Sequence, residues 1–155
     1  MATTPQFETV DHISITVRDM DAAKHFYADQ VGLTVVSDVT VDDHASGGPI
    51  YDQAHTKRRM VVFERVGGVT LALIAHPGDD LRGQPIENLD QVGLTHFAFT
   101  VRDLDGFVER MESMGVKPVA KGFFRDPDGN LIQFEGPGDA DRIKQQYNQR
   151  AAARS

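Results

Sequence analysis

Cysteine is absent from this chain of 155 residues. The sequence therefore allows neither a disulfide framework nor a metal site built from thiolates. A nucleophilic enzyme of this composition would have to use Ser, Thr, Lys or a carboxylate, and a metal ion would have to be bound by His, Asp, Glu, Gln or Asn. We expect a protein of a reducing compartment and assign it to the cytoplasm.

Long hydrophobic runs are absent as well, and positive charge is scarce. No apolar stretch approaches the roughly 20 residues that span a bilayer, and residues 1–11 (MATTPQFETVD) lack the basic start and apolar stretch of a signal peptide. The 16 Lys and Arg residues are outnumbered by 23 Asp and Glu residues, which gives a formal net charge of −7. Such a surface would be repelled by a phosphate backbone. We therefore expect a small-molecule substrate, and neither nucleic acid nor a membrane as partner.

The chain contains an internal repeat. Residues 12–21 (HISITVRDMD) recur as residues 96–105 (HFAFTVRDLD), and six of these ten positions are identical. This similarity predicts two copies of one structural unit. With 40% hydrophobic and 25% charged residues, the chain has the size and composition of one soluble domain. We predict a single domain over residues 1–155, with a first module at about 9–77, a linker at about 78–92, a second module at about 93–137 and a helical tail at 139–155.

Each copy has the pattern of one strand, one helix and three further strands. Alternating apolar residues predict the first strand. Asp19 and Asp103 are suited to begin the helices, and Gly32 and Gly115 are suited to end them. The predicted strands cover residues 10–17, 34–40, 59–66 and 70–75 in the first copy and 94–101, 117–120, 123–125 and 130–135 in the second.

A histidine lies at the same place in both repeated strands. The alternation puts His12 and His96 on the small, polar face of their strands, opposite the apolar face that packs. An isolated strand histidine is more often structural than a ligand, but its recurrence in both copies favours a ligand. Neutral imidazole binds Zn, Fe, Ni and Mn. If the two units pair about a pseudo-twofold axis, both imidazoles would face one shared metal pocket.

The last strand of the second copy carries two further candidates. Gln133 and Glu135 lie two residues apart, so both side chains can share one face. The position equivalent to Gln133 in the first copy is Ala72, which cannot bind a metal. His76 is a weak substitute there, and we interpret it instead as a solvent-exposed histidine at the end of a strand.

Three other features have less specific interpretations. Residues 126–129 (DPDG) predict a tight turn without a catalytic role. Arg58 and Arg59 would either clamp an anionic substrate or form a solvated charge pair. The polar loop at 41–58 is long enough to cover a site, and its candidate residues are His44, Tyr51 and His55.

Three stretches of sequence resemble the vicinal oxygen chelate superfamily. They are the opening HISITV with the following FY and GL, the repeat THFAFTV and the ending FRDPDGNLI, within about residues 9–137. The superfamily includes glyoxalase I, methylmalonyl-CoA epimerase, extradiol dioxygenases, fosfomycin-resistance enzymes and metal-free bleomycin-binding proteins. The resemblance implies an α+β fold in which paired βαβββ modules form an open, cupped β-barrel around a central pocket with a divalent metal. By analogy it also implies a homodimer.

The resemblance places the family's metal ligands on four positions of this chain. They fall on His12, Ala72, His96 and Gln133. Ala72 removes one ligand, and Gln133 replaces a carboxylate with an amide that can still bind through its oxygen. Glu135, one pleat further along, would restore a carboxylate if the strand register allows. The expected metal ligands are therefore His12 and His96 with Glu135, or with Gln133 in its place.

Three functions remain open on this basis. Two histidines and Glu135 would suit a non-haem Fe²⁺ oxygenase or dioxygenase, which we favour. A glyoxalase- or epimerase-like isomerase or lyase would use Zn²⁺, Ni²⁺, Co²⁺ or Mn²⁺ to stabilise an enolate, with Glu135 as catalytic base and Glu64 as a distant second choice. The third is a metal-free binding protein of the resistance type, against which the retention of both histidines argues.

Overall fold

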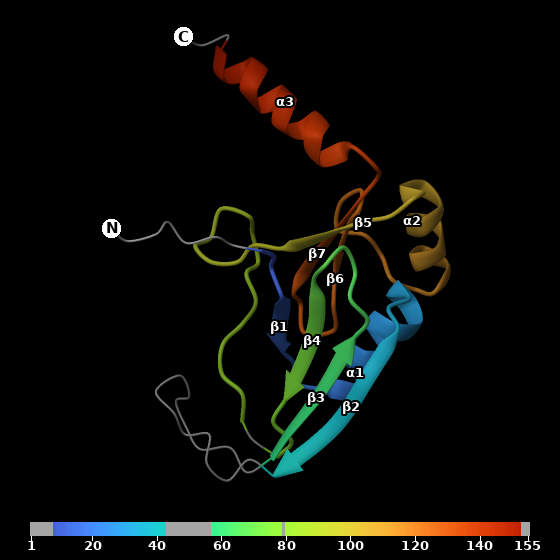
Figure 1. The fold of residues 1–155 in the computed structure, drawn as a ribbon, viewed down its shortest axis with the longest axis vertical. Helices are drawn as coiled ribbons and strands as arrows, with labels where there is room; N and C mark the ends of the chain where they lie inside the picture. The colour runs from blue at the N-terminus through green and yellow to red at the C-terminus, as the bar shows by residue number, and fades with distance from the viewer. Residues whose placement is uncertain (1–7, 43–56, 79, 153–155) are drawn as a thin grey trace. The chain divides into compact units, whose positions relative to one another are not determined.

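The structure is a computed structural model, and it describes residues 8–42, 57–78 and 80–152. The chain forms two compact units, Met1–Gly83 and Gln84–Ser155, and their boundary falls within the predicted linker. Each unit has an open β-sheet and helices, so the predicted α+β class is confirmed (Figure 1). Within the described residues, no helix has the length and apolar character needed to cross a membrane.

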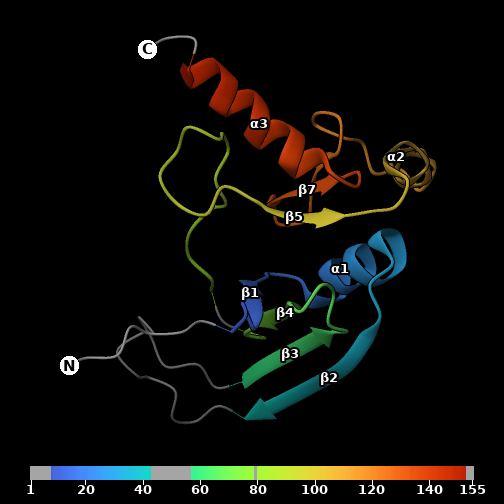
Figure 2. The same cartoon turned by 45° about the horizontal axis from the view of Figure 1, so that its top comes forward.

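The first unit contains a four-stranded sheet in the order β1-β4-β3-β2 (Figure 2). β1 runs parallel to β4, whereas the β4–β3 and β3–β2 pairs are antiparallel. The predicted βαβββ order of this unit is confirmed. Its elements are β1 (His12–Thr16), α1 (Met20–Lys24), the π-helical segment η1 (His25–Val31), β2 (Val35–Asp42), β3 (Lys57–Phe63) and β4 (Thr70–Ala75).

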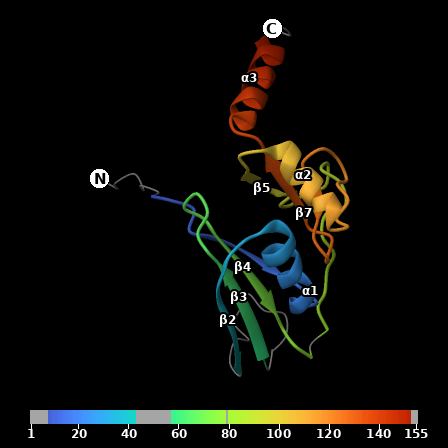
Figure 3. The same cartoon turned by 90° about the vertical axis from the view of Figure 1, so that its right-hand side faces the viewer.

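The helical segment of the first unit begins and ends at the predicted residues. The Asp19 carboxylate accepts hydrogen bonds from two backbone N–H groups of the first turn, both at 3.0 Å. Gly32 ends the segment with a φ of 96°. The π-helical course of η1 was not predicted. The helical segment lies along one face of the sheet (Figure 3), where the ring of Tyr27 lies 6.0 Å from that of Phe63.

The second unit has a three-stranded sheet in the order β5-β7-β6. The predicted strand at 117–120 is wrong, because among the described residues this stretch contributes only an isolated bridge between Ala120 and Phe123. Pro118 has no N–H group for a ladder, and a tight turn at Gly122 follows almost at once. The elements are β5 (Phe97–Thr100), α2 (Leu104–Ser113), β6 (Phe123–Arg125), β7 (Leu131–Glu135) and α3 (Asp139–Ala152).

Aromatic rings form the core of the second unit. The ring of Phe134 lies 4.3 Å from that of Phe107 on α2, 5.7 Å from that of Phe99 and 5.9 Å from that of Phe124. Asp103 begins α2 by accepting a hydrogen bond from the Gly106 N–H at 3.0 Å, as predicted. These contacts attach α2 to one face of the sheet and leave the opposite face of β5 and β7 open.

The tail forms the predicted helix, α3, which follows β7 (Figure 2). None of its residues is buried. This agrees with a sequence that favours helix but carries little apolar stripe.

Candidate functional site

The alternation of β1 places His12 on its open face. Ile15 and the following Val17 are buried, whereas 57% of the His12 side chain is exposed. The predicted division of the strand into a packing face and a polar face is confirmed here. It leaves the imidazole accessible to a ligand.

His12 contacts one charged residue, Asp11, which is itself paired with Arg65. Its Nδ1 atom lies 2.9 Å from Asp11 Oδ2, and Arg65 Nη2 donates a hydrogen bond of 2.7 Å to Asp11 Oδ1. The hydrogen bond with His12, followed by that with Arg65, lowers the pKa of the Asp11 carboxyl below its ordinary value. A proton on Nδ1 would leave Nε2 with the lone pair that a metal needs.

His96 has a similar local arrangement, but it lies just before β5, because this strand is shorter than the predicted 94–101 and begins only at Phe97. It is half-buried, and its Nδ1 atom lies 3.0 Å from the hydroxyl oxygen of Thr95. Its ring contacts the ring of Phe123 edge to face, with centroids 5.5 Å apart. In both units, therefore, the residue before the histidine contacts Nδ1, and Nε2 is the nitrogen left to bind a ligand.

Gln133 and Glu135 share one face of β7, as predicted. Both are half-buried, and the Gln133 side-chain N–H donates a hydrogen bond of 2.8 Å to Glu135 Oε1. Gln133 lies opposite Ala98 in the β5–β7 ladder, and Glu135 lies opposite Thr100. His96 lies just before β5, and its ring contacts that of Phe123, which lies opposite Gln133 in the β6–β7 ladder. This contact places His96 on the same side of the sheet as Gln133 and Glu135. Imidazole nitrogen, amide oxygen and carboxylate oxygen all suit a divalent metal ion.

A hollow of about 530 Å³ borders Gln133 and Glu135. Its lining includes residues from the start of α2 and the start of α3. Lys121 is paired there with Asp105 at 2.8 Å, and Arg142 is paired with Asp139. Arg102, at the end of the open face of β5, adds a further cation. The sequence did not indicate this hollow, because nothing in the repeat places α3 beside β7.

The equivalent strand of the first unit offers no metal ligand at the matching position. Ala72 is buried on β4, opposite Ser14 on β1 and Val62 on β3. The interpretation of His76 as solvent-exposed is wrong, since only 6% of this residue is exposed. His76 directly follows β4, which lies between β1 and β3 in the sheet.

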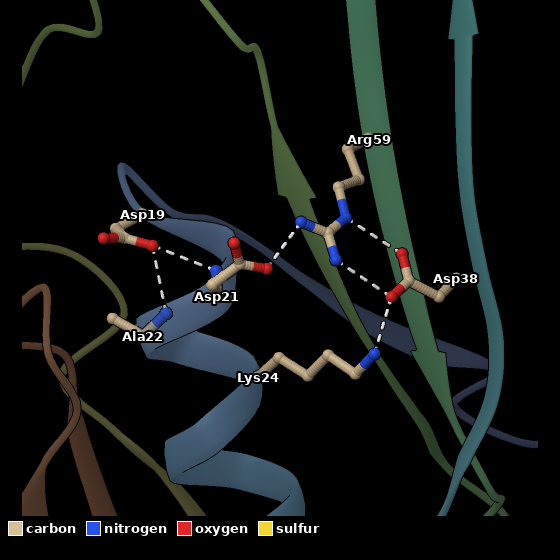
Figure 4. Close-up of polar contacts among 6 residues, drawn as sticks. All are labelled: Asp19, Asp21, Ala22, Lys24, Asp38 and Arg59. Atoms are coloured by element: carbon tan, nitrogen blue, oxygen red, sulfur yellow. Dashed lines mark hydrogen bonds and ion pairs between the residues drawn. The ribbon is translucent and has the colours of Figure 1, made fainter.

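Arg59 takes part in a charge network rather than presenting a free guanidinium (Figure 4). It donates two hydrogen bonds to Asp38, at 2.9 and 3.0 Å, and one to Asp21 at 2.7 Å. Lys24 on α1 also donates to Asp38, at 2.7 Å. The network ties α1 to β2 and β3, which supports the charge-pair interpretation of Arg59 over the anion clamp.

We expect the variant Asp38→Asn to lose about 1–2 kcal/mol of stability at pH 7. The hydrogen bonds from Arg59, followed by that from Lys24, hold the pKa of the Asp38 carboxyl well below its ordinary value. This stabilisation is present above the unfolded-state pKa of about 3.9 and is lost as the pH falls through the lower folded-state pKa. Urea unfolding at pH 7, 5 and 3 should show the difference from wild type shrinking toward acid. A difference that is unchanged at pH 3 would contradict the ion-pair explanation.

Some candidates fall outside the residues that the structure describes, namely His44, Tyr51 and His55 in the predicted loop. In the described part of either unit, no three His, Asp or Glu side chains are grouped as metal ligands. The predicted ligand set draws on both units.

Comparison with known proteins identifies the family. The family model of the Glyoxalase/Bleomycin resistance protein/Dioxygenase superfamily matches residues 9–134. The uncharacterized protein YaeR of Escherichia coli is 31% identical over 135 residues, which cover 81% of this chain and 93% of YaeR.

Solved structures show the same fold. A glyoxalase family protein from Bacillus cereus has a TM-score of 0.72 at 18% identity, over 88% of this chain and 98% of its own. The trypanothione-dependent glyoxalase I of Leishmania major has a TM-score of 0.63 at 18% identity, over 96% of this chain and 100% of its own. The sequence match and the shared fold agree with the resemblance seen in the repeat. The chain belongs to the glyoxalase/bleomycin resistance protein/dioxygenase superfamily.

Proposed function

We propose that this protein is a metal-dependent enzyme acting on a small molecule, and that it is a non-haem Fe²⁺ oxygenase. Its metal ligands would be His12, His96 and Glu135, with Gln133 as the alternative to Glu135. The observation that carries the proposal is this set of donor atoms. It comprises one imidazole in each unit with Nε2 left for a ligand and one amide–carboxylate pair on β7, whereas the buried Ala72 provides no donor.

The number of ligands favours an oxygenase. Two histidines and one carboxylate are typical of Fe²⁺ oxygenases, because a bound ion keeps open positions for both substrate and O₂. Ala72 contributes no donor that would fill one of them. The hydrogen bond from Gln133 holds the Glu135 carboxylate in one orientation, and such support of a metal-binding group strengthens binding. The hollow beside this pair is where a small substrate would enter.

The metal content of the protein tests the proposal. We expect protein purified without chelators or a metal column to hold near-stoichiometric iron by elemental analysis, and the variant His12→Ala/His96→Ala to hold almost none. His25→Ala is the matched control, because His25 is also exposed and also contacts an aspartate, yet lies outside the proposed site. Iron should then support O₂ consumption coupled to loss of a catechol-like or enolisable substrate.

Other outcomes would contradict the proposal. Metal that is retained in the double variant would rule out the two histidines as ligands. Protein that holds no metal and binds none on reconstitution would be a small-molecule binding protein instead. Zinc, nickel, cobalt or manganese in place of iron would favour an isomerase or lyase.

The hydrogen bond between Gln133 and Glu135 also supports that second candidate. If Gln133 binds the metal through its side-chain oxygen, the adjacent Glu135 carboxylate is free to move a substrate proton as general base. Deuterium from solvent would then enter the substrate at the carbon next to its carbonyl group, without O₂. Glu135→Gln would keep the metal and lose this exchange by about 10²–10⁴-fold. In the oxygenase, the same variant would lose metal affinity.

A further inference from the structure

A chain of hydrogen bonds links Arg65 to Asp11 and Asp11 to His12. The strand pairing of the first unit positions these residues. Asp11 immediately precedes β1, and its carbonyl oxygen accepts a hydrogen bond of 2.9 Å from the Thr70 N–H at the start of β4. Arg65 immediately precedes Val66, whose bridge with Val69 closes the turn that leads into β4. Residues far apart in the sequence are therefore brought together by the β1–β4 pairing.

The two oxygens of the Asp11 carboxylate have different partners. Oδ1 accepts from Arg65 at 2.7 Å, and Oδ2 lies 2.9 Å from His12 Nδ1. An ionised carboxylate can only accept hydrogen bonds. The contact with His12 therefore requires the proton on Nδ1, which leaves Nε2 without one. The Arg65 guanidinium donates to the other oxygen and so holds the carboxylate in this orientation.

We propose that Asp11 is a positioning residue, anchored by Arg65, that fixes the tautomer and orientation of the His12 imidazole so that Nε2 faces a metal ion as a lone-pair donor. This inference rests on the proposed function. A carboxylate behind a metal-bound histidine orients the ring and raises its basicity, and loss of such a partner typically costs 10–100-fold in metal affinity.

A purely structural role explains this arrangement poorly. The side chains are 68% exposed at Asp11, 57% at His12 and 50% at Arg65, and exposed ion pairs add little to stability. The second unit provides a contrast within the same chain. Thr95 occupies the place of Asp11, and its hydroxyl can either donate to His96 Nδ1 or accept from it. Of His12 and His96, therefore, it is His12 whose partner dictates where the imidazole proton lies.

The tautomer of His12 can be read directly in the metal-free protein. We expect ¹⁵N–¹H correlation spectra at a pH where the imidazole is neutral to show wild-type His12 protonated on Nδ1. In Asp11→Asn, Arg65 retains the amide oxygen and the amide N–H groups face Nδ1, so the proton should move to Nε2. Asp29→Asn is the matched control, because Asp29 contacts His25 Nδ1 at 2.7 Å, and it should leave His12 unchanged. A wild-type His12 protonated on Nε2, or one unaltered by Asp11→Asn, would overturn the proposal.

Titration with Co²⁺, followed by its visible absorption, tests the consequence for metal binding. We expect Asp11→Asn to weaken Co²⁺ binding about 10–100-fold and Asp29→Asn to leave it unchanged. Arg65→Gln should weaken binding less, and adding it to Asp11→Asn should cost nothing more, since Arg65 acts through Asp11. If His12→Ala abolishes binding but Asp11→Asn does not weaken it, the positioning role alone fails. If wild type binds no Co²⁺, the proposed function fails, and the role of Asp11 toward a metal fails with it.

Discussion

Replacement of Phe134 by alanine is expected to lower the free energy of unfolding by about 3–5 kcal/mol. Phe134 is 2% exposed, and its ring lies among those of Phe99, Phe107 and Phe124. Truncation would remove these contacts and leave a cavity between α2 and the sheet, because three rings held by separate elements cannot all move inward. Phe134 lies between Gln133 and Glu135 on β7. Its truncation would therefore also weaken the packing of the strand that carries these two candidate residues.

The variant Phe97→Ala is the control for the effect of Phe134. Phe97 is on the same packing face but is only half-buried, and its ring contacts that of Phe99 at 5.6 Å. We expect it to cost about 1–2 kcal/mol. Urea unfolding followed by circular dichroism measures both variants, since the chain has no tryptophan. Equal losses would mean that the aromatic cluster around Phe134 does not dominate the core of the second unit.

Gly122→Ala is expected to cost about 3 kcal/mol or more. Gly122 has a φ of 77°, and an added Cβ atom would lie 2.4 Å from the backbone oxygen of Phe134. The Phe134 N–H also donates to the Gly122 carbonyl oxygen at 2.7 Å, so the turn and β7 are held close together. A methyl group at this place would force the turn away from β7 and break that hydrogen bond.

The variant Gly115→Ala separates the cost of a side chain at positive φ from the cost of a clash with β7. Gly115 has nearly the same backbone conformation, with a φ of 82°, but an added Cβ atom would meet no atom within 4 Å. We therefore expect Gly115→Ala to cost only about 1 kcal/mol, the ordinary penalty of a side chain at positive φ. If urea unfolding gives the same loss for both variants, the close approach of the turn to β7 is not the cause at Gly122.

The sequence predicted those parts of the fold that depend on neighbouring residues. Asp19 and Asp103 begin their helices because a carboxylate caps the N–H groups two or three residues further along, whatever the rest of the chain does. The alternation around His12 likewise predicted which side chains of β1 are buried. By contrast, the π-helical course of η1 accompanies the packing of Tyr27 on Phe63, a residue of β3 that local sequence cannot indicate.

The candidate site could be predicted residue by residue but not in its supporting contacts. The faces of His12, Gln133 and Glu135 follow from strand periodicity, and the structure agrees with it. Asp11 also pairs with Arg65, a residue far from it in the sequence. The pairing of β1 with β4 brings the two side chains together. The local sequence likewise did not indicate the burial of His76. That His12 and His96 bind one metal ion stays a prediction.

The parallel pairing of the first and last strands has a consequence for how the protein is synthesised. In the described sheets, β1 is hydrogen-bonded only to β4, and β5 only to β7. On the ribosome, β1 and β5 are therefore each made first in their unit and stay unpaired until the last strand of that unit has been made. Such pairings across a long intervening segment form slowly and expose a strand edge meanwhile. The first unit can pair β1 with β4 while the second unit is still being translated. The unpaired strand edges of the two units are therefore exposed one after the other and not at the same time.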